Sequence, residues 1–193
     1  MQVMIRKISD EFVYKGIISR SDQAIFTYGL NLSILMLLNV STIIVLGIAF
    51  KMLINSTVFL VSFILVRSYS GGFHASGPKR CYIYSIFLLM ITFYIMKFTQ
   101  SYHSIWLIAL VAAFIIIFRL APVEAKNKAL SITEKKAFGQ KTKIILIALM
   151  TISMLCYLFD WNCIFISITS GLVSDSVLLV IGKTVQKYYK KSI

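Results

Sequence analysis

The stretch from Leu30 to Val66 decides the fold. It reads LNLSILMLLNVSTIIVLGIAFKMLINSTVFLVSFILV, and its only charged residue, Lys51, opens a short polar interruption that ends at Asn55. A membrane-spanning helix needs about 20 apolar residues, so this stretch is long enough for about two spans. We therefore predict two transmembrane helices that are joined by a short polar turn.

Two later blocks repeat this design. They run from Tyr82 to Ala121 and from Ile144 to Gly182, with polar interruptions at residues 97–104 and 160–162. The three blocks predict three helical hairpins, and hence six transmembrane helices within residues 30–182. We treat residues 1–193 as a single membrane domain that ends in a cytoplasmic tail at residues 183–193.

The composition supports an all-α polytopic membrane protein. Of the 193 residues, 59% are hydrophobic and only 14% are charged, which is too apolar for a soluble domain of this size. An open sheet is excluded because its unpaired backbone groups cannot face lipid. A transmembrane β-barrel would show segments of about ten residues with alternating polarity, and these blocks do not alternate.

Residues 1–27 are predicted to form an amphipathic helix that lies in the membrane interface. At helical spacing, Met1, Met4, Ile5, Ile8 and Phe12 project to one side of this segment. An apolar face of this kind can lie in the headgroup layer. A frayed basic leader is the alternative.

The basic residues predict the orientation in the membrane. All but two of the 20 Lys and Arg residues fall on one side of the six-span topology, and the two exceptions are Lys51 and Lys97. Cytoplasmic loops carry the Lys/Arg excess, so both termini and the loop after the second span are predicted to be cytoplasmic. The net charge of +13 needs no nucleic acid, because topology and anionic lipid headgroups explain it. We therefore predict that these basic residues interact with the lipid bilayer.

The loop from Arg67 to Cys81 carries the candidate chemistry. It reads RSYSGGFHASGPKRC and contains one of the two histidines and one of the three cysteines of the chain. A cysteine becomes an effective nucleophile when a base or a positive neighbour favours its thiolate. Cys81 is therefore the candidate nucleophile and His74 the candidate general base. Proline is favoured as the first residue of a helix, so we expect a helix to begin at Pro78 and its positive end to favour the Cys81 thiolate.

Three further residues of this loop are candidates for support. Gly71 and Gly72 allow a sharp turn, and their N–H groups could bind the oxyanion of a tetrahedral intermediate. Arg67 could pair with a substrate carboxylate or hold the loop. Taken singly, each of these features is ordinary in a purely structural loop.

The remaining thiols, Cys156 and Cys163, are expected to be small hydrophobic residues. A disulfide between them stays open as an alternative. No metal site and no cofactor are predicted, since the few histidines and cysteines are split between the two membrane faces.

Two motifs resemble the accessory gene regulator B (AgrB) family. The first is Arg67-x-x-x-Gly71-Gly72-x-His74 followed by Cys81, and the second is Ala121-Pro122-Val-Glu124-x-x-Asn127-Lys128. The resemblance implies a membrane cysteine endopeptidase of bacterial quorum sensing that forms a homodimer. Such an enzyme removes the C-terminal tail of an AgrD-type propeptide and promotes closure of a thiolactone or lactone ring. It also implies that Cys81 is the nucleophile and His74 its base.

The Lys-rich segment at residues 126–143 is a candidate binding site for the acidic tail of such a precursor. Its candidate residues are Lys126, Lys128, Lys135 and Lys136, which would act by electrostatic steering. A solvated loop that only sets the topology is the alternative.

Two carboxylates, Glu124 and Asp175, are candidates to orient His74, and a simple dyad is an equal alternative. Asp175 lies within an apolar block, where carboxylates are functional by default, although Ser174 and Ser176 could simply partner it. Two non-protease functions also remain open. A small transporter or channel would use Asp175 and the polar stretch Ser167–Ser176, and a membrane signalling partner would need no enzymatic site.

Overall fold

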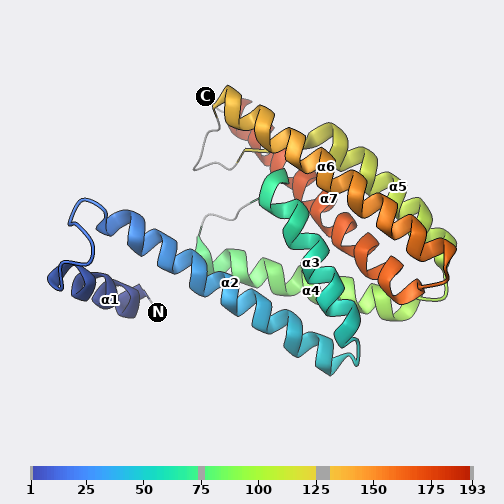
Figure 1. The fold of residues 1–193 in the computed structure, drawn as a ribbon, viewed down its shortest axis with the longest axis horizontal. Helices are drawn as coiled ribbons and strands as arrows, with labels where there is room; N and C mark the ends of the chain where they lie inside the picture. Colours follow the sequence, from blue (N-terminus) through green and yellow to red (C-terminus); the bar gives the residue numbers. More distant parts are fainter. Residues whose placement is uncertain (1, 74–76, 125–130, 192–193) are drawn as a thin grey trace.

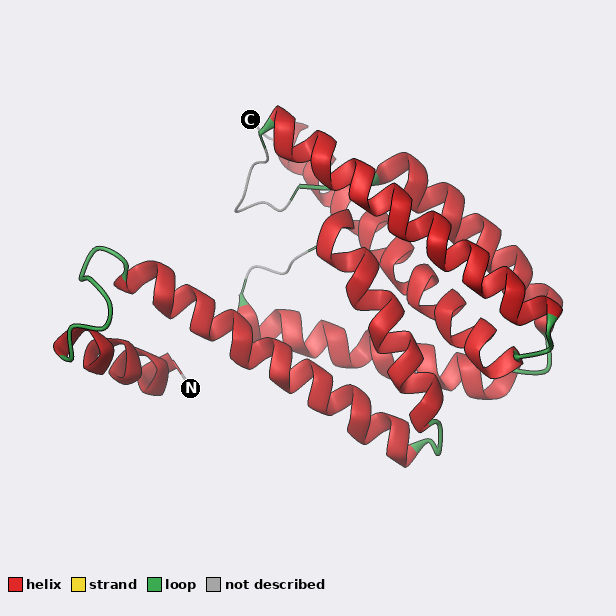
Figure 2. Cartoon of the chain, in the orientation of Figure 1, coloured by secondary structure: helices red, strands yellow, loops and turns green. Residues whose placement is uncertain are grey.

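The structure is a computed structural model that describes residues 2–73, 77–124 and 131–191. All regular elements in these ranges are helices, which confirms the predicted all-α class (Figure 2). In chain order they are α1 (Gln2–Tyr14), α2 (Gln23–Ala49), α3 (Leu53–Ser70), α4 (Pro78–Thr99), α5 (His103–Leu120), α6 (Ile132–Leu158) and α7 (Asn162–Lys191).

Helices α2 to α7 are each long and apolar enough to cross a membrane, which confirms the six predicted spans. Short turns at residues 50–52, 100–102 and 159–161 separate the members of each hairpin, at the polar interruptions of the sequence. Many large apolar side chains on these helices are exposed, for example Leu37 (66%) and Val45 (62%) on α2. A continuous exposed apolar surface marks contact with lipid rather than water.

Helix α7 is the central helix of the bundle. Of its apolar stretch, 67% is buried, and it packs most extensively against α3 and α5. Small residues allow the close approach to α3: a Cβ atom on Gly171 would lie 3.2 Å from the Ser62 Cβ. Helices in lipid associate through such small-residue contacts, because lipid supplies no hydrophobic drive between them.

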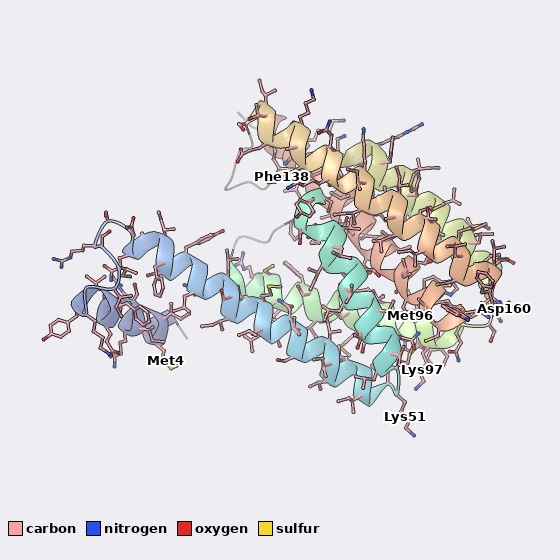
Figure 3. The ribbon with its side chains drawn as sticks, in the orientation of Figure 1. Met4, Lys51, Met96, Lys97, Phe138 and Asp160 are labelled. Carbon is pink, nitrogen blue, oxygen red and sulfur yellow. The ribbon has the colours of Figure 1, made fainter. Side chains whose placement is uncertain are left out.

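Labelled side chains mark the two ends of the bundle. Lys51, Lys97 and Asp160 lie at one end, and Phe138 on α6 lies at the other (Figure 3). The end of α3, the start of α6 and the C-terminal part of α7 meet at this second end (Figure 1). The two basic residues that the topology assigned to the opposite side therefore share one end of the structure.

The N-terminal helix is shorter than the range 1–27 expected for it. Helix α1 ends at Tyr14, and Gly16 follows with a φ of +67°, a left-handed conformation that ends helices and that glycine adopts without strain. Helix α2 then begins at Gln23. At the C-terminus, residues 183–191 of the expected tail continue helix α7 without a break.

Helix α1 folds back along the first turns of α2, away from the rest of the bundle (Figure 1). The rings of Phe12 and Phe26 stack with their centroids 5.1 Å apart, and Ile5 is completely buried. Met4, which belongs to the same predicted apolar face, is 64% exposed. Part of the amphipathic face thus packs on α2, and part remains open to a membrane.

Candidate active site

The candidate nucleophile lies where the sequence placed it. Gly77 caps α4 and Pro78 is its first residue, which confirms the predicted helix start. The N–H of Cys81 donates to the Gly77 carbonyl at 3.0 Å, so Cys81 sits at the beginning of the helix as a half-buried free thiol. His74, the candidate base, lies outside the described residues.

Arg67 organises the loop that leads to His74. Its guanidinium donates one hydrogen bond to the Gly71 carbonyl and another, of 2.6 Å, to the Phe73 carbonyl. Of the two roles considered for Arg67, the structure therefore supports loop binding. The guanidinium thereby holds the loop segment directly before His74.

Gly71 and Gly72 tie the same loop to the segment that follows α5. Gly71 forms a parallel bridge with Val123, and the Gly72 N–H donates to the Val123 carbonyl at 3.1 Å. Their φ angles are +69° and +115°, in the region that favours glycine. The Gly72 N–H was a candidate oxyanion donor. This N–H already donates to a carbonyl within the fold, and the oxyanion role stays a prediction.

Helix α7 forms the surface against which the loop lies. The Phe73 N–H donates to the Leu178 carbonyl at 3.0 Å. A Cβ atom on Gly182 would lie only 2.6 Å from the Phe73 nitrogen, so the loop backbone rests directly on this glycine. The Phe73 ring also lies 6.2 Å from that of Tyr84, one helical turn beyond Cys81.

The sequence interpretation missed Val123, Leu178 and Gly182. Their contacts join segments that are far apart in the chain, and periodicity carries no signal for such pairs. The single available clue was a glycine inside a helical pattern, which often marks a close backbone approach.

Asp175 is buried beneath this loop, with partners other than those expected. The Ser70 hydroxyl donates to its carboxylate at 3.1 Å, and Arg67 Nη1 lies 3.7 Å from the same Oδ1 atom. Ser174 and Ser176, its expected partners, bond to other groups of the bundle. The neighbours along α7 point to other sides of the helix, whereas the end of α3 meets Asp175 directly.

Glu124, the other candidate to orient His74, forms an ion pair with Lys135 at 3.3 Å. Its backbone carbonyl accepts a hydrogen bond from the Gln186 side chain on α7. Helix α7 therefore contacts both the loop before His74 and the segment before the Lys-rich region.

Two of the four candidate substrate-binding lysines lie among the described residues. Lys135 and Lys136 are exposed on the first turns of α6, which begins with a capping box between Ser131 and Glu134. Lys126 and Lys128 lie outside the described residues. Exposed lysines at the beginning of a helix that extends beyond the apolar span are accessible to an acidic ligand.

The two other cysteines lie apart from this site. Cys156 is buried within α6, and both it and Cys163 are free thiols, so the disulfide left open between them is not formed. Cys163 lines an open cavity of about 410 Å³ together with His103, at the end of the bundle that carries Lys97.

Comparison with known proteins matches this chain to one family. The family model for accessory gene regulator B matches residues 2–180. Putative AgrB-like protein 2 from Clostridium perfringens (strain 13 / Type A) is 25% identical over 169 residues, which cover 83% of this chain and 77% of that protein. Accessory gene regulator protein B from Staphylococcus intermedius is 27% identical over 132 residues, which cover 68% of this chain and 61% of that protein.

No solved structure gives a significant match to the chain. The family assignment therefore rests on sequence, and the model for the family spans nearly all of the six apolar helices described above. This multi-pass membrane protein belongs to the accessory gene regulator B family of quorum-sensing systems.

Proposed function

We propose that this protein is a membrane-embedded cysteine endopeptidase that removes the C-terminal tail of an AgrD-type propeptide and promotes closure of a thiolactone or lactone ring. One observation carries the proposal. Arg67 binds the carbonyls of Gly71 and Phe73, directly before His74, and the Phe73 ring lies 6.2 Å from that of Tyr84, one helical turn beyond Cys81. The chain segment that leads to the candidate base thus lies beside the helix that carries the candidate nucleophile.

In the proposed first step, the Cys81 thiolate attacks the carbonyl carbon of the scissile peptide bond. A bond forms between Cys81 Sγ and this carbon, and the carbon–nitrogen bond breaks. The His74 imidazolium gives its proton to the departing amine, which leaves with the C-terminal tail. The N-terminal part of the precursor remains bound to the enzyme as a thioester.

In the proposed second step, a cysteine or serine of the bound precursor attacks this thioester. His74 accepts the proton of the attacking group, the ring bond forms, and the bond to Cys81 Sγ breaks to regenerate the thiolate. With a cysteine, one thioester replaces another at nearly equal energy. Water would compete by hydrolysis, and a site sheltered at the membrane surface limits that competition.

The charges around the site support an acidic precursor tail as the ligand of Lys126, Lys128, Lys135 and Lys136. Lys135 and Lys136 are exposed at the same end of the bundle as the loop before His74. Their attraction for the tail would position the scissile bond near Cys81 and would weaken as salt screens it.

The proposed setting is the bacterial cell membrane, with both termini and the site on the cytoplasmic side. Support comes from the distribution of Lys and Arg, since Lys51 and Lys97 share the opposite end of the structure. A homodimer, which the family resemblance implies, is part of the proposal.

A transport pathway along Ser167–Ser176 has less support. Ser167, Ser170 and Ser176 donate their hydroxyl hydrogen bonds to backbone carbonyls of α7 itself. The stretch is largely buried, and Gly171 packs closely on α3.

Coexpression with a precursor tests the proposed activity. A precursor with a tag at each end should lose its C-terminal tag when it is coexpressed with this protein. Brief quenching with acid should trap the N-terminal part on the enzyme through a bond that hydroxylamine cleaves, as it does thioesters. Immunoblotting follows both species. An intact precursor in the presence of membrane-inserted protein would refute the endopeptidase activity.

Thiol labelling tests the orientation. In a variant without native cysteines, Ser101→Cys should react with a membrane-impermeant maleimide on intact cells. Ala137→Cys, at the other end of the bundle, should react only after the cells are made permeable. Both positions are exposed, so labelling reports the side of the membrane rather than burial. The reverse pattern would overturn the proposed orientation.

A further inference from the structure

A buried carboxylate on α7 has no role in the reaction as described so far. The small polar residues of that helix are explained by packing, since Gly171 and its neighbours let α7 approach α3 closely. Asp175 differs from them because it carries a charge and is 0% exposed. Placing a carboxylate within the membrane is costly, so a packing role alone does not account for it.

The Asp175 carboxylate contacts the side chains of Ser70 and Arg67. Its Oδ1 atom accepts a hydrogen bond from Ser70 and faces Arg67 Nη1 at 3.7 Å. Its Oδ2 atom has no hydrogen-bond partner among the described residues. Arg67 is the basic residue with which Asp175 forms an ion pair, and the Arg67 side chain is itself only 16% exposed.

The guanidinium of Arg67 contacts both this carboxylate and the loop before His74. Nη1 faces Asp175 and donates to the Gly71 carbonyl, while Nη2 donates to the Phe73 carbonyl. A planar guanidinium can serve several acceptors at fixed angles only while its plane is held. Backbone carbonyls carry no net charge, so Asp175 supplies the counter-charge that keeps the cation buried here.

We propose that Asp175 is a positioning residue for precursor processing: it holds the Arg67 guanidinium in the orientation that binds Gly71 and Phe73, and so fixes the loop before His74 beside the helix that carries Cys81. This inference rests on the proposed function and deepens it. Asp175 touches neither precursor nor reacting atoms in this role, and it acts through Arg67.

The variant Asp175→Asn tests this role, because asparagine keeps the shape and one acceptor oxygen but removes the charge. Arg67 would then lack its counter-charge and turn towards water, which releases the two carbonyls. With purified protein in nanodiscs and a tagged precursor, we expect the maximal cleavage rate to fall at least about 10-fold while the apparent KM changes less than about 3-fold. The matched control is Asp160→Asn, the same substitution at the opposite end of the bundle, which should cleave at the parent rate.

A double variant separates positioning from a general structural role. If Asp175 acts only through Arg67, then Arg67→Gln with Asp175→Asn should cleave no more slowly than Arg67→Gln alone. If the losses of the two single variants multiply in the double variant, the proposal is overturned. A parent-like rate of Asp175→Asn, or a change in that variant that is confined to KM, also overturns it.

If Asp175→Asn fails to insert into the membrane, Ser70→Ala replaces it. We expect this variant to lose about 2- to 5-fold in rate, and a parent-like rate would overturn the proposal. A parent protein that leaves the precursor intact refutes the proposed function itself, whereas cleavage by the parent with no effect of these variants refutes only the role of Asp175.

Discussion

Cys81→Ser and His74→Ala should each leave the precursor uncleaved while the protein remains in the membrane. Serine lacks a thiolate at neutral pH, so Cys81→Ser removes the covalent route, and we expect a loss of more than about 10³-fold. Loss of general acid–base catalysis usually costs about 10²- to 10⁴-fold, which sets the expectation for His74→Ala. Neither change alters the apolar helices that drive insertion.

Immunoblotting of a doubly tagged precursor measures both effects, with the amount of membrane-inserted enzyme determined in parallel. The matched control is the double variant Cys156→Ala and Cys163→Ala, which removes the two thiols outside the candidate site. It should process the precursor within a few-fold of the parent. Cleavage by Cys81→Ser, or its loss in the control at normal expression, would mean that the nucleophile has been assigned wrongly.

Gly182→Ala should lower processing about 10- to 100-fold, although it adds a single methyl group. The new Cβ atom would lie 2.6 Å from the Phe73 nitrogen and 2.8 Å from the Gly72 carbonyl carbon. These are backbone atoms, and the loop cannot simply move aside, because Val123, Leu178 and Arg67 all bind it. We therefore expect the methyl group to displace the loop before His74 and to misalign the candidate pair.

Gly29→Ala is the matched control for this prediction. Gly29 lies within α2, and among the described residues no atom beyond its chain neighbours and the backbone of α2 would lie within 4 Å of a Cβ atom placed there. Alanine favours a helix over glycine by about 1 kcal/mol at either position, so helix propensity cannot cause a loss that is confined to Gly182. The rate of tail release per inserted protein is the measurement. Equal rates for both variants would show that the contact between Gly182 and the loop does not position the site.

Much of the fold followed from local properties of the sequence. In lipid, each helix satisfies its own backbone hydrogen bonds, so the length and polarity of a segment are enough to identify a span. The start of α4 at Pro78 was predictable for a similar reason, because proline lacks the N–H that the first turn leaves unpaired. The N-terminal segment was harder, since the turn at Gly16 lies between two stretches of helical spacing and divides residues 1–27.

The sequence by itself also determined which residues are candidates for chemistry, because His74 and Cys81 share one polar loop between two apolar blocks. Only the tertiary structure decided what supports that loop. Asp175 pairs with Arg67 rather than with its neighbours in sequence, and the loop rests on Gly182. Hydropathy reports whether a helix meets lipid, but the contacts between helices depend on the rotation of each helix about its axis and on its height in the bundle. These are settled by packing between distant segments, to which no local pattern in the chain corresponds.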